Sequence, residues 1–176
     1  MIGGEKTKNE GRKNDMAILQ ILDDSNDVLR KKCREVTEIT PRILTLLDDM
    51  TETLHRANGA GLAAPQVGVL RRVVLVEAEP GQLYELINPE IVEARGEQCE
   101  VEGCLSLPHQ WGTVKRPAWV KVKAQNRKGE WVFYEGEELL ARAFCHEIDH
   151  LNGILFKDKA EHMMSRKEIE EYFAED

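Results

Sequence analysis

The pattern of apolar and polar positions predicts two long amphipathic helices. After Pro41, apolar side chains recur every three or four residues, a spacing that places them on one face of a helix. Thr40 is suited to cap this helix, Pro41 fits its first turn, and Gly59 is suited to end it. A similar pattern covers residues 139–151 and stops before Gly153. The apolar flanks of this second helix indicate that it is buried.

Elsewhere the period changes to two, which predicts β-strands. Strands are expected at residues 73–76 and 84–88, and again at 119–124 and 131–134. The last two are separated by a turn at Gly129 and form a predicted hairpin. Because strands come in runs rather than alternating with helices, the predicted fold class is α+β, with small antiparallel β-sheets packed around the central buried helix.

Shorter elements complete the prediction. We expect an extended arm or strand at 16–24, a short helix at 25–33, a strand at 154–156 and a polar helix at 165–173. Residues 1–15 are polar and rich in Gly, Lys and Glu, so we expect a disordered leader there. Residues 16–176 are long enough for a single domain with a substantial core.

Composition narrows the classes of function. The net charge of −8 argues against a nucleic-acid-binding surface and against attraction to anionic membranes. No run of about 18 apolar residues is present, so no membrane span is expected. The first 15 residues lack the apolar core of a signal peptide. This favours a cytoplasmic location and free thiols for the four cysteines.

The second helix carries the motif H-E-x-x-H at residues 146–150. Residues four apart lie on one helical face, so His146 and His150 can bind one metal ion together. Glu147 lies one step around the helix, where a general base is needed beside a metal-bound water. The alternative interpretation is a buried helix with two hydrogen-bonded histidines, but the full motif favours metal binding.

A catalytic metal site needs a third protein ligand, and several arrangements are open. The metzincin pattern is excluded because Phe156 occupies the third-histidine position. Glu170 and Glu171 stand at the distance past His150 that is expected for a thermolysin-like ligand. Cys104 is a third candidate, because a thiolate binds zinc or ferrous iron well, although it could also be an inert buried thiol. A closed structural zinc site that joins Cys99 and Cys104 to both histidines is a further alternative.

A loop dense in small residues follows the first helix at residues 59–68. Part of it caps that helix. Small residues beyond the cap also let another chain lie along the backbone, and Gln66 then offers a neutral donor near whatever is bound there.

Three stretches together resemble the signature motifs of the peptide deformylase family. They are G-A-G-L-A-A-P-Q at 59–66, E-G-C-L-S at 102–106 and H-E-I-D-H at 146–150, in the family's order. The resemblance runs from about Ala17 to Lys159. It implies an enzyme that removes the formyl group from N-formylmethionyl peptides and releases formate.

The resemblance also implies a set of roles. Cys104, His146 and His150 would hold one divalent metal, usually ferrous iron in this family, with zinc or nickel as substitutes. Glu147 would take a proton from the attacking water and pass it to the departing amine. The Gln66 side-chain amide and the Leu105 backbone N–H would stabilise the oxyanion.

Peptide binding follows from the same resemblance. The edge formed by Gly59, Ala60 and Gly61 would pair with the substrate backbone as an added strand. An apolar pocket for the methionine side chain would draw on Gly103, Leu105, Leu139, Arg142, Ala143 and His146.

Some positions depart from the family pattern. Ala60 and Arg142 stand where aliphatic residues are frequent, and Trp111 replaces a residue that is often basic. An enzyme that acts on nascent peptides is expected to come transiently near the ribosome. The predicted C-terminal helix is acidic, however, whereas members that dock on the ribosome use a basic one. Without a long insertion between the first two motifs, the chain resembles the shorter, type 1 form.

Overall fold

The computed structural model describes residues 17–175, so the expected leader at residues 1–15 lies outside the described residues. The elements follow one another in the order η1 (Asp27–Arg30), α1 (Pro41–Ala57), β1 (Gly61–Ala63), η2 (Ala64–Val67), β2 (Val73–Val76), β3 (Tyr84–Arg95), β4 (Gln98–Cys104), β5 (Leu107–Arg116), β6 (Trp119–Gln125), β7 (Trp131–Glu137), α2 (Glu138–His150), α3 (Phe156–Lys159), β8 (Ala160–Met163) and α4 (Arg166–Ala174).

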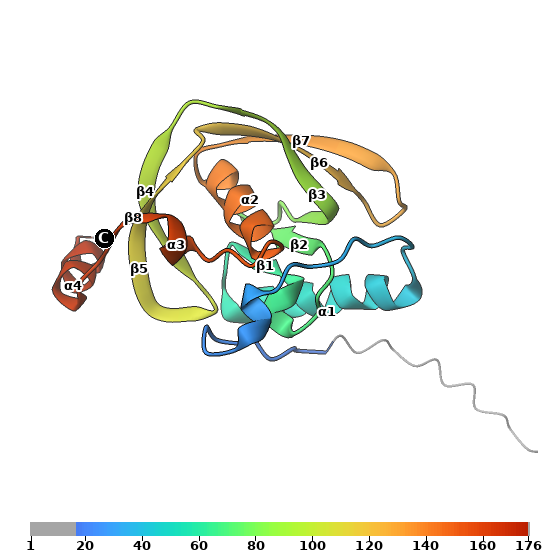
Figure 1. The fold of residues 1–176 in the computed structure, drawn as a ribbon, viewed down its shortest axis with the longest axis horizontal. Helices are drawn as coiled ribbons and strands as arrows, with labels where there is room; N and C mark the ends of the chain where they lie inside the picture. The colour runs from blue at the N-terminus through green and yellow to red at the C-terminus, as the bar shows by residue number, and fades with distance from the viewer. Residues whose placement is uncertain (1–16, 176) are drawn as a thin grey trace, which may run out of the picture.

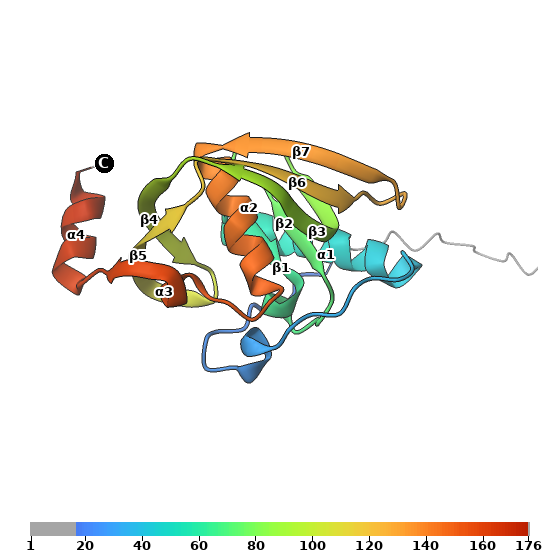
Figure 2. The same ribbon diagram turned by 45° about the horizontal axis from the view of Figure 1, so that its top comes forward.

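Two antiparallel sheets surround helix α2, as Figures 1 and 2 show. The larger sheet has the strand order β1-β2-β3-β6-β7, and the smaller has the order β4-β5-β8. The predicted hairpin is present, because β6 and β7 pair from Trp119↔Glu137 to Gln125↔Trp131. The predicted α+β class, with small antiparallel sheets around a central buried helix, is confirmed.

Strand β2 explains why the region between the two long helices is so apolar. Its four residues, Val73 to Val76, are all buried. Alternate side chains of a strand point to opposite faces. Val74 and Val76 share a core with α2, whereas Val73 and Leu75 share a second core with α1. A helix therefore covers each face of the sheet at this strand, and α2 is held in the interior.

The end of α1 differs by one position from the prediction. Asn58, not Gly59, adopts the left-handed conformation that closes the helix, with φ of 57°. Gly59 is small for another reason, because a Cβ there would lie 2.8 Å from Leu105 Cδ1. The first glycine of the small-residue loop thus makes room for the chain next to the second motif.

The predicted strand at 154–156 is wrong. Residues 154 and 155 have no regular structure, and Phe156 begins the short helix α3. Leu155 and Phe156 are buried with Leu29 and Leu107. Their apolar character therefore serves packing in the core rather than strand pairing. A run of three consecutive apolar residues is compatible with either a core contact or a strand.

The second sheet was not predicted from the pattern. Strands β4 and β5 pair from Gln98↔Arg116 to Cys104↔Leu107, but their alternation of apolar and polar residues is weak. The helix expected at 25–33 is only the short 3-10 helix η1, capped by Asn26. The described part of the expected N-terminal arm, residues 17–23, has no regular secondary structure.

Candidate active site

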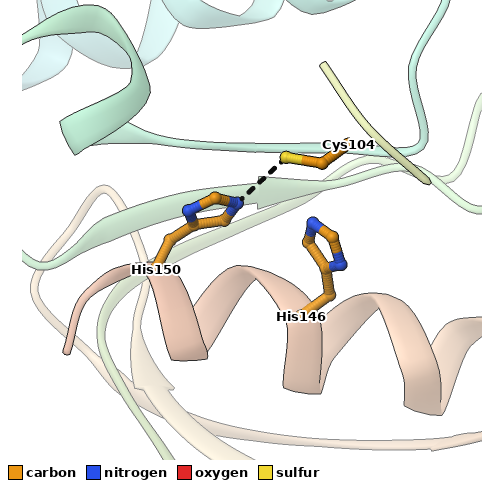
Figure 3. Close-up of side chains that lie close together, drawn as sticks. All are labelled: Cys104, His146 and His150. Carbon is orange, nitrogen blue, oxygen red and sulfur yellow. Dashed lines mark hydrogen bonds between the residues drawn. The ribbon is translucent and has the colours of Figure 1, made fainter. Parts of the chain in front are cut away.

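Helix α2 brings the two histidines of the motif to one side, and strand β4 brings Cys104 to meet them. Figure 3 shows both imidazole rings rising from α2 toward the cysteine sulfur. One ligand atom from each of the three residues lies within 4.8 Å of the others. The Sγ of Cys104 is 3.4 Å from Nε2 of His150. The contact between Cys104 and His150 joins residues that are 46 positions apart in the chain.

The hairpin between β4 and β5 positions Cys104. The pairing of these strands is irregular between Glu102 and Cys104, and Leu105 and Ser106 form the turn that follows. A bulge in a strand redirects the side chains next to it. Cys104 thus ends β4 beside α2, and the backbone of Leu105 lies next to the ligand group.

Glu102 orients one of the two histidines. The Nδ1 of His146 donates to Oε1 of Glu102 over 2.9 Å. Because a carboxylate only accepts, Nδ1 carries a proton, so in the neutral form of the ring Nε2 is the nitrogen left to bind a metal. Arg116 donates from Nε and Nη2 to the same carboxylate, and from Nη1 to Asp149. Burial alone would raise the pKa of Glu102, but the hydrogen bonds from His146 and Arg116 hold it below its usual value.

Sequence analysis missed this supporting group. Glu102 lies within the second motif and Asp149 within the third, but neither was assigned a role. Arg116 carries no motif signal, since only the fold places it between them. The signal that could have found Glu102 is a carboxylate two residues before a ligating cysteine, in a chain whose histidines need an orienting acceptor.

We expect Glu102→Gln to weaken metal affinity by about 10- to 100-fold, the usual effect of removing an orienting carboxylate. The amide keeps the shape of the side chain but can no longer accept with full negative charge from His146 and Arg116. Competition with a chelator measures the affinity, and the thermal unfolding midpoint of the metal-free protein shows whether folding is retained. Unchanged affinity in the folded variant would contradict the role of Glu102.

Glu147 lies beside the ligand group in a buried position. Its side chain packs on Gly61, where a Cβ would lie 2.8 Å from Glu147 Cγ. Its Oε1 is 3.7 Å from Nε2 of His146, and its Oε2 has no hydrogen-bond partner among the described residues. Burial raises the pKa of this carboxyl to about 7. A group that must take and return a proton near neutral pH works best with such a pKa.

Gln66 is held with its amide nitrogen toward the site. It is 1% exposed and lies in η2, directly after β1. Its Oε1 accepts from the backbone N–H of Ala63 (2.9 Å), which fixes the orientation of the amide. Its Nε2 then donates to Ser106 Oγ (3.0 Å) and lies 3.6 Å from Cys104 Sγ. The predicted neutral donor is thus next to the ligand group.

A cavity of about 490 Å³ opens beside these residues. It brings together every residue that the resemblance implied for peptide binding: Gly59, Ala60, Gly61, Gly103, Leu105, Leu139, Arg142, Ala143 and His146. Trp111 and His109 also line it. Arg142 donates to Gln98 (2.9 Å), so its charged end is held at the wall. Strand β1 is an edge of the larger sheet.

The geometry does not support the alternative ligand sets. Glu170 is exposed on α4 and pairs with Arg166 (3.1 Å). Cys99 is exposed in β4 and is not in the group of ligand atoms found among the described residues. Phe156 stacks on the His146 ring, with centroids 6.0 Å apart.

The residues present fit a divalent transition metal. A thiol sulfur and two imidazole nitrogens converge, and the buried Oε2 of Glu147 lacks a partner within the described chain. Burial lowers the pKa of His150 well below its usual value, which keeps the ring in the neutral form that ligates metals. Sulfur and imidazole donors suit iron, zinc or nickel rather than magnesium or calcium.

An H-E-x-x-H helix inside an α+β fold, with a cysteine from the neighbouring sheet and an adjoining cavity, defines a metal-dependent hydrolase. Comparison with known proteins identifies the family of hydrolases to which the chain belongs. The family described as polypeptide deformylase matches residues 18–166. The peptide deformylase of Acetivibrio thermocellus is 58% identical over 155 residues, which cover 88% of this chain and 91% of that protein.

Solved structures agree. The peptide deformylase of Thermotoga maritima has a TM-score of 0.79 and 38% identity, covering 82% of this chain and 99% of that one. The Met-Ala-Ser-bound class I type b peptide deformylase of Acinetobacter baumannii has a TM-score of 0.78 and 34% identity. The match covers 82% of this chain and 99% of that one. The chain belongs to the peptide deformylase family, hydrolases that remove the N-formyl group from nascent peptides.

Proposed function

We propose that Cys104, His146 and His150 hold the divalent ion of this deformylase and that Glu147 is its general base. The observation that carries this assignment is the convergence of the three ligand atoms within 4.8 Å, next to a buried carboxyl. Ferrous iron is the proposed physiological ion, as the resemblance to the family implies, and zinc or nickel would fit the same donors.

When bound, the ion supplies Lewis-acid chemistry that activates a water near neutral pH. Glu147 takes the proton of that water at its free oxygen and delivers it to the departing amine. The Nε2 of Gln66 and the backbone N–H of Leu105 donate to the oxyanion that develops on the formyl group. Glu102 keeps His146 in the ligating tautomer throughout.

The substrate peptide is proposed to lie along the edge of β1. Gly59, Ala60 and Gly61 line the cavity, and β1 has a strand neighbour on one side only. An extended peptide can add to such an edge through backbone hydrogen bonds. The methionine side chain would enter between Leu139, Ala143 and Gly103. Binding of Met-Ala-Ser by the Acinetobacter baumannii relative supports a peptide of this kind as the ligand.

We place the activity in the cytoplasm, where formylated chains leave the ribosome. No described helix is long and apolar enough to cross a membrane. Transient proximity to the ribosome follows from the nascent substrate. Docking through α4 is not part of the proposal, because α4 carries Glu168, Glu170 and Glu171.

Formate release from formyl-Met-Ala-Ser, by protein loaded anaerobically with iron, tests this proposal. Replacing Gln66 should lower kcat by about 10²- to 10³-fold, the usual effect of losing one oxyanion donor. Gln66→Glu keeps the acceptor for the Ala63 N–H but loses the amide donor, whereas Gln66→Leu loses both. We expect both variants to be impaired and to keep their metal. No release by the iron-loaded wild type would contradict the site assignment.

A further inference from the structure

Helix α4 stands apart from the body of the protein, at the end of the smaller sheet (Figures 1 and 2). None of its described residues is buried. Its start is well defined, because Ser165 and Glu168 cap it reciprocally. Near its other end, the ring of Phe173 packs edge-to-face on Trp111, with centroids 5.0 Å apart and planes at 68°. An aromatic contact therefore holds a helix that buries little of its own surface.

Trp111 also lies directly against the proposed substrate cavity. A Cβ added to Gly103 would lie 2.3 Å from Cζ3 and 2.5 Å from Cε3 of the indole. The ring therefore covers the backbone of the residue that precedes Cys104, and it forms part of the cavity wall. The backbone of Trp111 is anchored as well, because the Trp111 carbonyl oxygen accepts a hydrogen bond from the N–H of Met164 (2.9 Å).

The side chain of Trp111 thus links α4 to the cavity. The backbone of Trp111 is held within β5, but its indole can turn about two side-chain bonds unless a neighbour restrains it. Gly103 contributes no side chain to its close contact with the indole, and Phe173 is the aromatic ring that packs on the indole among the described residues.

We propose that Phe173 holds the indole of Trp111 against Gly103, so that α4 sets the width of the substrate cavity. Phe173 is a positioning residue, because it acts through Trp111 and does not itself line the cavity. The inference rests on the proposed use of this cavity as the peptide site. Because no hydrogen bond or ring contact joins the indole to Cys104, His146 or His150 among the described residues, loss of the contact should alter substrate binding rather than the chemical step.

The test compares Phe173→Ala with Phe173→Leu and with Glu171→Ala, an exposed position on the same helix. In iron-loaded full-length protein, Phe173→Ala should raise KM for formyl-Met-Ala-Ser by about two- to tenfold, the range that an edge-to-face aromatic pair supports. The kcat should not change. Phe173→Leu should raise KM less than Phe173→Ala does, and Glu171→Ala should leave KM unchanged.

A double-mutant cycle separates this role from a general loss of stability. Trp111→Ala should itself raise KM, and adding Phe173→Ala to it should cause no further change. Acrylamide quenching reports on the indole directly, in a background that carries Trp119→Phe and Trp131→Phe. Trp111 should become more accessible to the quencher in Phe173→Ala.

Two results would overturn the inference while wild type remains active. One is an unchanged KM and unchanged quenching in Phe173→Ala. The other is that Phe173→Ala raises KM by the same factor in the wild-type and Trp111→Ala backgrounds. An inactive wild type loaded with iron would instead count against the proposed site.

Discussion

Cys104→Ala is expected to abolish formate release and to leave the purified protein without its metal. The variant removes the only sulfur among the three ligand atoms that lie within 4.8 Å of one another in the described chain. Two histidines on one helix do not complete a three-ligand catalytic site. Elemental analysis after gel filtration measures metal per chain, and formate release from formyl-Met-Ala-Ser measures activity.

The matched control is Cys99→Ala, which removes an exposed thiol from the same strand. It should keep both metal and activity, whereas a structural site of two cysteines and two histidines would lose its metal. Cys145 is a second control, because burial raises its thiol pKa to about 11 and it lies in the core of the fold. If Cys104→Ala retained stoichiometric metal and activity, the ligand assignment would be wrong, and Glu170→Ala would be the next variant to measure.

Glu147→Gln is expected to lower kcat by about 10²- to 10⁴-fold while the metal stays bound. The amide keeps the volume that packs on Gly61, so the site should not collapse. It cannot take a proton from the attacking water. The three ligand atoms are untouched, which separates this variant from Cys104→Ala.

Glu147→Ala is the companion variant, because it removes both the base and the packing on Gly61. Similar losses of kcat in the two variants would attribute the effect to proton transfer. A Glu147→Gln enzyme with nearly wild-type kcat and full metal content would show that another group moves the proton.

Local features of the sequence determined much of the fold. The 3.6-residue period and the Thr40 cap specify α1, and the run at 73–76 predicts a strand, which the structure buries on both faces. These signals act between near neighbours, so they can be identified without tertiary contacts. The H-E-x-x-H spacing likewise places His146 and His150 on one helical face whatever surrounds them.

Other features required knowledge of what packs against what. The apolar residues at 154–156 could serve a strand or a core contact, and burial against Leu29 and Leu107 selected the latter. The strands at 98–116 alternate weakly, so only their pairing reveals them.

The sequence by itself therefore determined the α+β class, the motif helix and the family, through short-range spacing and three recognisable motifs. Only the tertiary structure showed that Glu102 and Arg116 support His146, that Gly61 is small because Glu147 packs on it, and that Phe173 reaches Trp111. Each of these contacts joins residues far apart in the chain. No local period or propensity encodes such a contact, and only the folded chain brings its two partners together.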